Sequence, residues 1–214
     1  MLISHQSQKI FISIPKTGST SIMSSLNEGS LHYKPAIYHA SFSEILAFDD
    51  KTLMNNDFLF IGNKFNLSTN FFKKKISEYA IYAVIREPIE RLISVYCDAK
   101  KDKNHKTLKE ISKLDSLDEF CRFYLSKNPL DHPRHLWPQN FFISNVPLKN
   151  LHLYHFNNLQ GLLNKLYGNF FWQNVALPHL RRTDSASLKL HIKSSLLKKL
   201  KVSLKDDYSL YNSL

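Results

Sequence analysis

The segment that decides the fold is Lys9-Ile-Phe-Ile-Ser-Ile14, followed at once by Pro15-Lys16-Thr17-Gly18-Ser19-Thr20-Ser21. The first six residues are rich in β-branched and aromatic side chains, which predicts a short buried strand. The next seven form a turn rich in hydroxyl groups, and a helical pattern then runs from near Thr20 to about Asn27. A strand that turns through such a loop into a helix is typical of α/β proteins that hold phosphate groups.

The chemistry of this loop favours an anion. A helix N-terminus offers unpaired N–H groups and the positive end of the helix dipole. Gly18 permits a tight turn, and Lys16 adds a point charge. The Walker pattern G-x-x-x-x-G-K-[ST] is not matched, because Lys16 precedes the only glycine of the loop. The sequence therefore argues against a Mg-ATP site, and an ordinary strand-to-helix turn stays open as the alternative.

A second strand-to-helix junction lies in the middle of the chain. Residues 79–85, Tyr-Ala-Ile-Tyr-Ala-Val-Ile, form the best predicted strand, which runs directly into Arg86-Glu87-Pro88. Proline suits the first turn of a helix, and an apolar stripe extends this helix to about Lys101. Arg86 thus stands where a predicted strand ends, which in a parallel sheet is the edge that binds ligands.

The helix after Arg86 carries a second candidate group. Ser94 lies off the apolar stripe, on a face shared with Arg91, and a guanidinium and a hydroxyl so placed suit a second phosphate. The alternative is a surface arginine paired with Glu87 or Glu90.

The remaining pattern predicts one α/β domain over residues 1–214. We expect a P-loop-like, three-layer fold with a short, mostly parallel central sheet flanked by helices. The further predicted elements are a helix over 39–48 with a Ser41–Glu44 capping box, a strand over 58–61, a helix opened by Ser116 and Glu119, an irregular stretch over 131–139, a strand over 151–156, a helix over 158–167 and a mostly helical segment over 185–214.

Charge and cysteine content narrow the function classes. The formal net charge of +11 favours an anionic partner, although lysine runs such as Lys73-Lys74-Lys75 and Lys198-Lys199 also suit solvated helix faces. Two cysteines, Cys97 and Cys121, lie in apolar helical patterns and are expected to be buried thiols in a reducing compartment. With no signal-peptide pattern and no apolar run of membrane-spanning length, we expect a cytoplasmic protein.

Taken together, the two junctions resemble the PAPS-dependent sulfotransferases, in the branch that holds Golgi carbohydrate sulfotransferases and bacterial relatives. PAPS is the sulfate donor 3′-phosphoadenosine-5′-phosphosulfate. Residues 15–21 match the family's P-K-[TS]-G-[GST]-[ST]-[ST] loop throughout. Residues 86–96 match R-[DNE]-P-x-x-R-x-x-S-x-Y, with Glu87 a mild variant. Weaker echoes are Trp137-Pro138-Gln139 for W-x-P-Q, residues 155–159 (His-Phe-Asn-Asn-Leu) for F-E-x-L, and residues 177–183 for a late nucleotide-covering loop in which Arg181 replaces the usual Asn.

This resemblance implies a role for each candidate residue. It implies that Lys16 contacts the phosphosulfate and stabilises charge on the leaving phosphate, that Arg86 and Ser94 bind the 3′-phosphate, and that no metal is required. The other implied donor contacts are Pro15, Thr17, Gly18, Ser19, Thr20, Ser21 and, in the late loop, Arg182.

The general base is less defined. His39 opens a His-Ala-Ser-Phe-Ser-Glu segment that resembles K-H-x-[ST]-x-x-E of bacterial members, and Glu44 is the second candidate. Other relatives carry the base in a G-H pair, where this chain has Gly62-Asn63, and asparagine cannot serve as a base. His132 and His135 are three residues apart, but no further ligands complete a zinc site, so a structural or acceptor-binding role is expected.

We therefore predict transfer of the sulfuryl group of PAPS to a hydroxyl of an acceptor, with a saccharide or glycolipid favoured. The alternatives are a non-catalytic basic protein that binds PAP (3′-phosphoadenosine-5′-phosphate), other nucleotides or nucleic acid, a degenerate sulfotransferase without a base, and a nucleotide kinase. The kinase is disfavoured by the unmatched Walker lysine. No nucleic acid partner is expected, and the acceptor, the oligomeric state and peripheral membrane association stay open.

Overall fold

The structure is a computed structural model, and it describes residues 1–4, 8–26, 39–48, 76–102, 105–167, 177 and 185–214. These residues form two compact units that interleave along the chain. The first unit takes residues 1–14, 18–84 and 141–180, and the second takes residues 15–17, 85–140 and 181–214. The prediction of a single domain over residues 1–214 stays a prediction.

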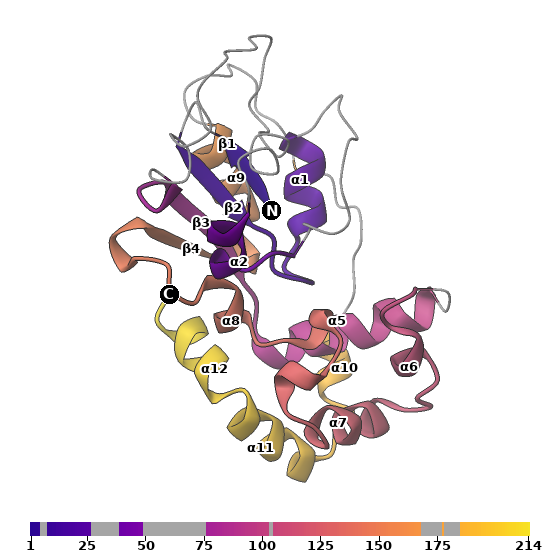
Figure 1. The fold of residues 1–214 in the computed structure, drawn as a ribbon. Helices are drawn as coiled ribbons and strands as arrows, with labels where there is room; N and C mark the ends of the chain where they lie inside the picture. The colour runs from indigo at the N-terminus through magenta and orange to yellow at the C-terminus, as the bar shows by residue number, and fades with distance from the viewer. Residues whose placement is uncertain (5–7, 27–38, 49–75, 103–104, 168–176, 178–184) are drawn as a thin grey trace. The chain divides into compact units, whose positions relative to one another are not determined.

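The first unit is built on a four-stranded sheet in the order β1-β2-β3-β4 (Figure 1). Strands β2 and β3 run parallel, with Ile12 opposite Ala83, and β1 pairs antiparallel with β2. Parallel neighbours end at the same edge of a sheet. The loop that starts at Pro15 and the segment that starts at Arg86 therefore follow strand ends of one edge. The strands are β1 (Leu2–Ser4), β2 (Lys9–Ile12), β3 (Ala80–Ile85) and β4 (Leu151–His155).

Helices α1 (Ser19–Leu26) and α9 (Leu159–Tyr167) cover one face of this sheet (Figure 1). Side chains of alternate strand residues point to opposite faces. The side chains that meet in this layer are Phe11, Tyr82 and Val84 from the strands, Ile22 and Met23 from α1, and Leu162, Leu163 and Leu166 from α9. The described chain is thus a mixed α/β fold with a short, mostly parallel sheet flanked by helices, as the sequence predicts.

The second unit is helical and packs around α5 (Pro88–Lys101). Helix α5 begins and ends where the sequence predicts, with Pro88 in its first turn and the Glu87 carboxylate accepting the N–H of Glu90 at 2.7 Å. Its apolar stripe supplies Ile89, Leu92 and Val95 to the core. The other helices of this unit are α6 (Lys109–Ser112), α7 (Leu117–Leu125), α10 (Ser185–Lys189), α11 (Ser194–Ser203) and α12 (Lys205–Asn212), and α8 (Gln139–Ile143) begins in it.

Some predicted details need correction. The first predicted strand ends at Ile12 instead of Ile14, because its ladder with β3 stops there, and the strand β1 was not predicted. The helix over 39–48 contracts to α2 (Phe42–Ala47), but its Ser41–Glu44 capping box is confirmed. At α7 the box is one-sided, because the Glu119 carboxylate accepts the N–H of Asp115, one residue before the cap.

Other predictions hold or lie outside the described residues. The irregular stretch over 131–139 begins at the last residue of the 3-10 turn η2 (Pro129–Asp131) and contains the 3-10 turn η3 (Arg134–Leu136). The strand over 58–61 and the Gly62-Asn63 pair lie outside the described residues. Both cysteines are free thiols, and the prediction that they are buried is confirmed for Cys121 but wrong for Cys97, which is half-buried. Among the described helices, none has the length and apolar character needed to cross a membrane.

Candidate functional site

The two sequence motifs contact each other within the second unit. The Arg86 side chain is 6% exposed, and its Nη1 donates to the backbone oxygen of Lys16 at 3.2 Å. Its Nη2 donates to Oγ of Ser185, in the first turn of α10, at 2.6 Å. The alternative of a surface arginine paired with Glu87 or Glu90 does not fit a guanidinium this deeply buried.

The backbone of Arg86 is held by a single side chain. The amide of Gln139 accepts the Arg86 N–H and donates to the Arg86 carbonyl, both at 2.9 Å. Gln139 is fully buried, and its own N–H and that of Asn140 donate to the carboxylate of Asp207 at 2.9 Å. This chain of bonds gives the W-x-P-Q echo a physical role, because its glutamine fixes the residue at the end of β3.

Lys16 forms an ion pair with Asp98 of α5. Its Nζ lies 3.2 Å from Oδ2, and the two side chains are only 14% and 20% exposed. Lys16 has a φ of 65°, in the left-handed region that residues other than glycine rarely adopt. Strained backbone conformations of this kind are common at functional sites. Pro15 and Thr17, on either side, are buried.

Ser94 lies on the same side of α5 as Asp98. The two residues are four apart, which places them one above the other along a helix. Ser94 is 3% exposed. Arg91, which shares this face, is fully buried and donates to the carbonyls of His135 at 2.9 Å and Trp137 at 2.7 Å. The guanidinium of Arg91 therefore serves the 134–137 segment.

The rest of the loop belongs to the first unit. Gly18 has a φ of 78°, and a Cβ built on it would lie 2.6 Å from Cδ1 of Leu159 and 3.2 Å from Cε2 of Phe156. Only glycine meets both requirements. Phe156 and Leu159 are the two residues of the F-E-x-L echo, so that echo marks the side chains that pack on the loop glycine.

Helix α1 begins at Ser19, and the carbonyl of Gly18 accepts the N–H of Ile22. The predicted helix start near Thr20 is therefore confirmed to within one residue. Ser19 is buried, Ser21 is half-buried and Thr20 is exposed. These hydroxyls stand at the first turn of an eight-residue helix, where backbone N–H groups lack partners within the helix.

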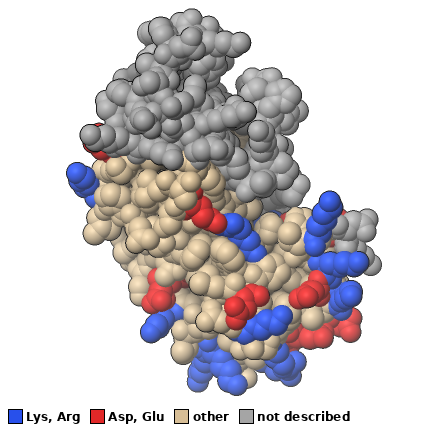
Figure 2. All heavy atoms as spheres, viewed as in Figure 1, with Lys and Arg blue, Asp and Glu red and all other residues tan. Residues whose placement is uncertain are grey.

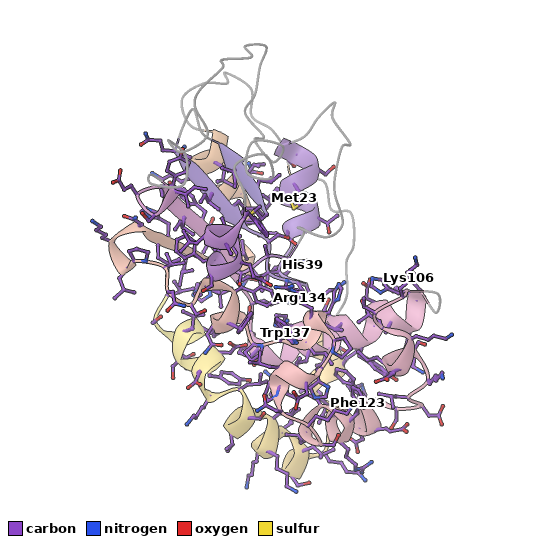
Figure 3. All side chains as sticks on the ribbon, viewed as in Figure 1. Met23, His39, Lys106, Phe123, Arg134 and Trp137 are labelled. Atoms are coloured by element: carbon purple, nitrogen blue, oxygen red, sulfur yellow. The ribbon has the colours of Figure 1, made fainter. Side chains whose placement is uncertain are left out.

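His39 is anchored to the strand that leads into the loop. Its Nδ1 lies 2.7 Å from the carbonyl oxygen of Ser13, so Nδ1 donates and the lone pair of the neutral ring sits on Nε2. His39 precedes α2 and is labelled in Figure 3. The second candidate base, Glu44, accepts hydrogen bonds from the N–H and the hydroxyl of Ser41 at 2.7 and 2.8 Å.

The histidines of the 132–135 segment have structural partners. Nε2 of His132 lies 2.9 Å from the carbonyl of Tyr124, and its ring stacks on the Tyr124 ring. Trp137 donates its indole N–H to the carbonyl of His132, and the guanidinium of Arg134 lies 4.9 Å from the Trp137 ring centroid; Figure 3 labels both side chains. Burial, reinforced by the neighbouring His105 and Lys16, lowers the pKa of His135 to about 4.

Sequence reasoning missed four partners of the predicted residues: Asp98, Ser185, Gln139 as the clamp on Arg86, and Ser13. The helical spacing from Ser94 could have indicated Asp98. Arg182 lies outside the described residues, as do most residues of the late loop. In the described part of the chain, no three His, Cys, Asp or Glu side chains are grouped so as to hold a metal ion.

Three comparisons with known proteins bear on the family of this chain. Residues 1–212 match the model of the sulfotransferase family. The search of curated proteins gave no match. A crystal structure of a sulfotransferase from Alicyclobacillus acidocaldarius is similar to this chain, with a TM-score of 0.49, 12% sequence identity, and coverage of 94% of this chain and 92% of that one. On the match of its sequence to the family model, this chain belongs to the sulfotransferase family.

Proposed function

We propose that this protein transfers the sulfuryl group of PAPS to a hydroxyl of an acceptor, a carbohydrate or glycolipid, by in-line displacement. One observation supports this most directly: the Arg86 guanidinium contacts the backbone of Lys16, so the two motif residues that would hold the two phosphate ends of the donor are neighbours. Sequence positions 70 residues apart are joined by this bond.

The proposed chemistry follows from these charges. The acceptor oxygen forms a bond to sulfur while the bond from sulfur to the 5′-phosphate oxygen breaks, and PAP leaves with the electron pair. The transition state is loose, so positioning and charge stabilisation supply most of the catalysis. Lys16 and the N–H groups of the loop stabilise the departing phosphate. Arg86 and Ser94 hold the 3′-phosphate, and Arg182 remains a predicted donor contact.

His39 is the proposed general base. Its hydrogen bond to the Ser13 carbonyl fixes the tautomer in which Nε2 accepts a proton, and that atom takes the proton of the acceptor hydroxyl. The same bond stabilises the imidazolium that results. Glu44 is the weaker candidate, because its carboxylate oxygen Oε2 already serves the capping box of α2.

The acceptor is proposed from charge alone. The net charge of +11 suits an anionic saccharide or the surface of an anionic glycolipid. Figure 2 shows Lys and Arg side chains gathered at the lower edge of the view, where Figure 1 places α11, and the exposed lysines there include Lys198, Lys199 and Lys201. The two free thiols suit a reducing compartment, so we propose that the protein acts in the cytoplasm.

The first test is calorimetric titration with PAP, ADP and ATP, with and without magnesium. We expect PAP to bind without magnesium and more tightly than ADP or ATP. Preference for Mg-ATP, or no binding of any nucleotide, would refute the proposal.

A second test concerns catalysis. Lys16→Ala should reduce sulfuryl transfer by about 100-fold or more with the fold retained, since one charge-stabilising donor is worth about that factor. Lys165→Ala, at an exposed residue of α9, is the matched control and should transfer normally. Equal activity of the two variants would exclude Lys16 from the reaction. PAP binding without transfer to any acceptor would favour a degenerate sulfotransferase.

A further inference from the structure

The ion pair between Lys16 and Asp98 is more deeply buried than most ion pairs between lysine and aspartate side chains. Most ion pairs of surface residues are exposed, whereas these two side chains are 14% and 20% exposed, with 3.2 Å between Nζ and Oδ2. Burial reduces screening by water, so each charge strongly affects the energy of its neighbour. The Lys16 ammonium is therefore already neutralised before any donor enters.

We propose that Asp98 is a positioning residue that competes with the sulfate donor for Lys16. The carboxylate holds the ammonium in the ligand-free protein, and the phosphosulfate of the donor displaces it. This inference rests on the proposed function, because it assumes that the ligand at Lys16 is the 5′-phosphosulfate of PAPS.

The placement of Asp98 favours its displacement from Lys16 by a bound donor. Asp98 stands one helical turn from Ser94, which would contact the 3′-phosphate, so a bound donor brings several negative charges close to the carboxylate. The phosphates of the donor and the carboxylate of Asp98 repel each other because both are negative. The contacts that the donor makes with the protein must overcome this repulsion. Lys16 can then turn from carboxylate to donor because its side chain has a long, flexible stem.

Two consequences concern specificity. A ligand without a 3′-phosphate displaces Asp98 with only the free energy of its contacts with the loop. PAPS gains further binding free energy because its 3′-phosphate also contacts Arg86. Asp98 thus lowers the affinity for every ligand at Lys16, and only ligands with both phosphate ends retain useful affinity. The same competition keeps Lys16 from stabilising a leaving phosphate until the donor is fully seated, which limits wasteful attack by water.

The reaction avoided in this way is hydrolysis of the donor. Water would attack sulfur, the bond from sulfur to the 5′-phosphate oxygen would break, and PAP, inorganic sulfate and a proton would result. This side reaction needs no acceptor, so it can be measured with donor and enzyme alone.

The test compares three variants in titrations with PAP and ADP. Asp98→Asn removes the charge and should bind both nucleotides at least about tenfold more tightly than wild type, as expected for one unit charge at short range in a partly buried site. Asp98→Glu keeps the charge and should bind PAP within about threefold of wild type. Asp206→Asn, an exposed residue of α12, is the matched control for net charge and should change little.

A second measurement, the hydrolysis of PAPS, distinguishes a positioning role of Asp98 from a purely structural one. Hydrolysis of PAPS without acceptor should rise several-fold in Asp98→Asn and stay at the wild-type level in the other two variants. Equal or weaker PAP binding by a folded Asp98→Asn protein would overturn the inference. If that variant does not fold, Asp98→Ser carries the same prediction. Failure of the wild-type protein to bind PAP would instead refute the proposed function.

Discussion

Two buried arginines of one motif, Arg86 and Arg91, hold different kinds of partner. Arg91 is completely buried, and both its terminal nitrogens donate to carbonyls of the 135–137 segment. Arg86 is 6% exposed and donates to a loop carbonyl and to the Ser185 hydroxyl, which lies 99 residues away in the chain. A phosphate can replace neutral partners such as these, because its bonds to a guanidinium are stronger.

The difference teaches that the spacing R-x-x-x-x-R joins a structural residue to a candidate binding residue. The motif alone does not say which arginine has which task. The hydrogen-bond partners distinguish the two tasks. Arg91 bonds only to main-chain carbonyls of one segment, which suits a structural residue. Arg86 bonds to two segments far apart in the chain, and a ligand that binds Arg86 can change the position of both.

The largest expected effect is on stability. Arg91→Ala should lower the free energy of unfolding by about 3 kcal/mol or more, because it removes a fully buried side chain together with its hydrogen bonds to the carbonyls of His135 and Trp137. Urea denaturation followed by circular dichroism measures this. Arg86→Ala, measured in the same way, should lose clearly less. If the Arg91 variant is as stable as wild type and loses only PAP binding, the assignment of a structural role to Arg91 is wrong.

The next effect is on affinity. Arg86→Ala should weaken PAP binding by about 30-fold or more, which corresponds to the loss of a charge-assisted contact with the 3′-phosphate. Adenosine 5′-phosphosulfate, which lacks that phosphate, should bind almost as it does to wild type. Arg134→Ala, in which the guanidinium over Trp137 is removed, serves as the control. Equal losses for both ligands would exclude Arg86 from the 3′-phosphate site.

The smallest effect is a dependence of stability on pH in the Arg91 region. The pKa of His135 is lowered from 6.5 to about 4, first by burial and then by the charges of His105 and Lys16. Between these two values the unfolded chain binds more protons than the folded one, so stability falls as pH drops from about 6.5 to 4. The loss should reach about 2 kcal/mol, after allowance for partial exposure.

His135→Gln tests this contribution. The variant should lose less stability than wild type between pH 6.5 and 4 in urea titrations, while the curves run parallel at higher pH. Identical pH profiles for the two proteins would show that His135 titrates normally. Burial also lowers the pKa of His132, so His132→Gln is the companion measurement that separates the two rings.

Local patterns predicted the elements that carry the candidate site. The strand before Pro15, the helix start near Thr20 and the whole of α5 follow from side-chain periodicity and from the position of Pro88. The motif residues Lys16 and Arg86 were also named from the sequence. These features depend on neighbours within a few residues, which is the range that sequence patterns report.

The features of the site that the sequence did not predict depend on contacts between residues far apart in the chain. Nothing near Gln139 indicates that its amide would clamp residue 86, and nothing near Ser185 indicates a bond to Arg86. The Asp98 partner lies 82 residues beyond Lys16 (98 − 16) and carries no motif of its own. Tertiary packing decides such pairs, so a pattern read along the chain does not contain them.

The link from Asp207 through Gln139 to Arg86 has a consequence for biosynthesis. Ribosomes make the loop and β3 early, but Asp207 lies 68 residues after Gln139 and belongs to α12. Until α12 has emerged, the N–H groups of Gln139 and Asn140 lack their carboxylate, and the residue at the end of β3 is only partly fixed. Domains dominated by such long-range contacts fold late and slowly. Arg86 should therefore reach its final position only after α12 has been synthesised, later than the pairing of β3, the strand that precedes it.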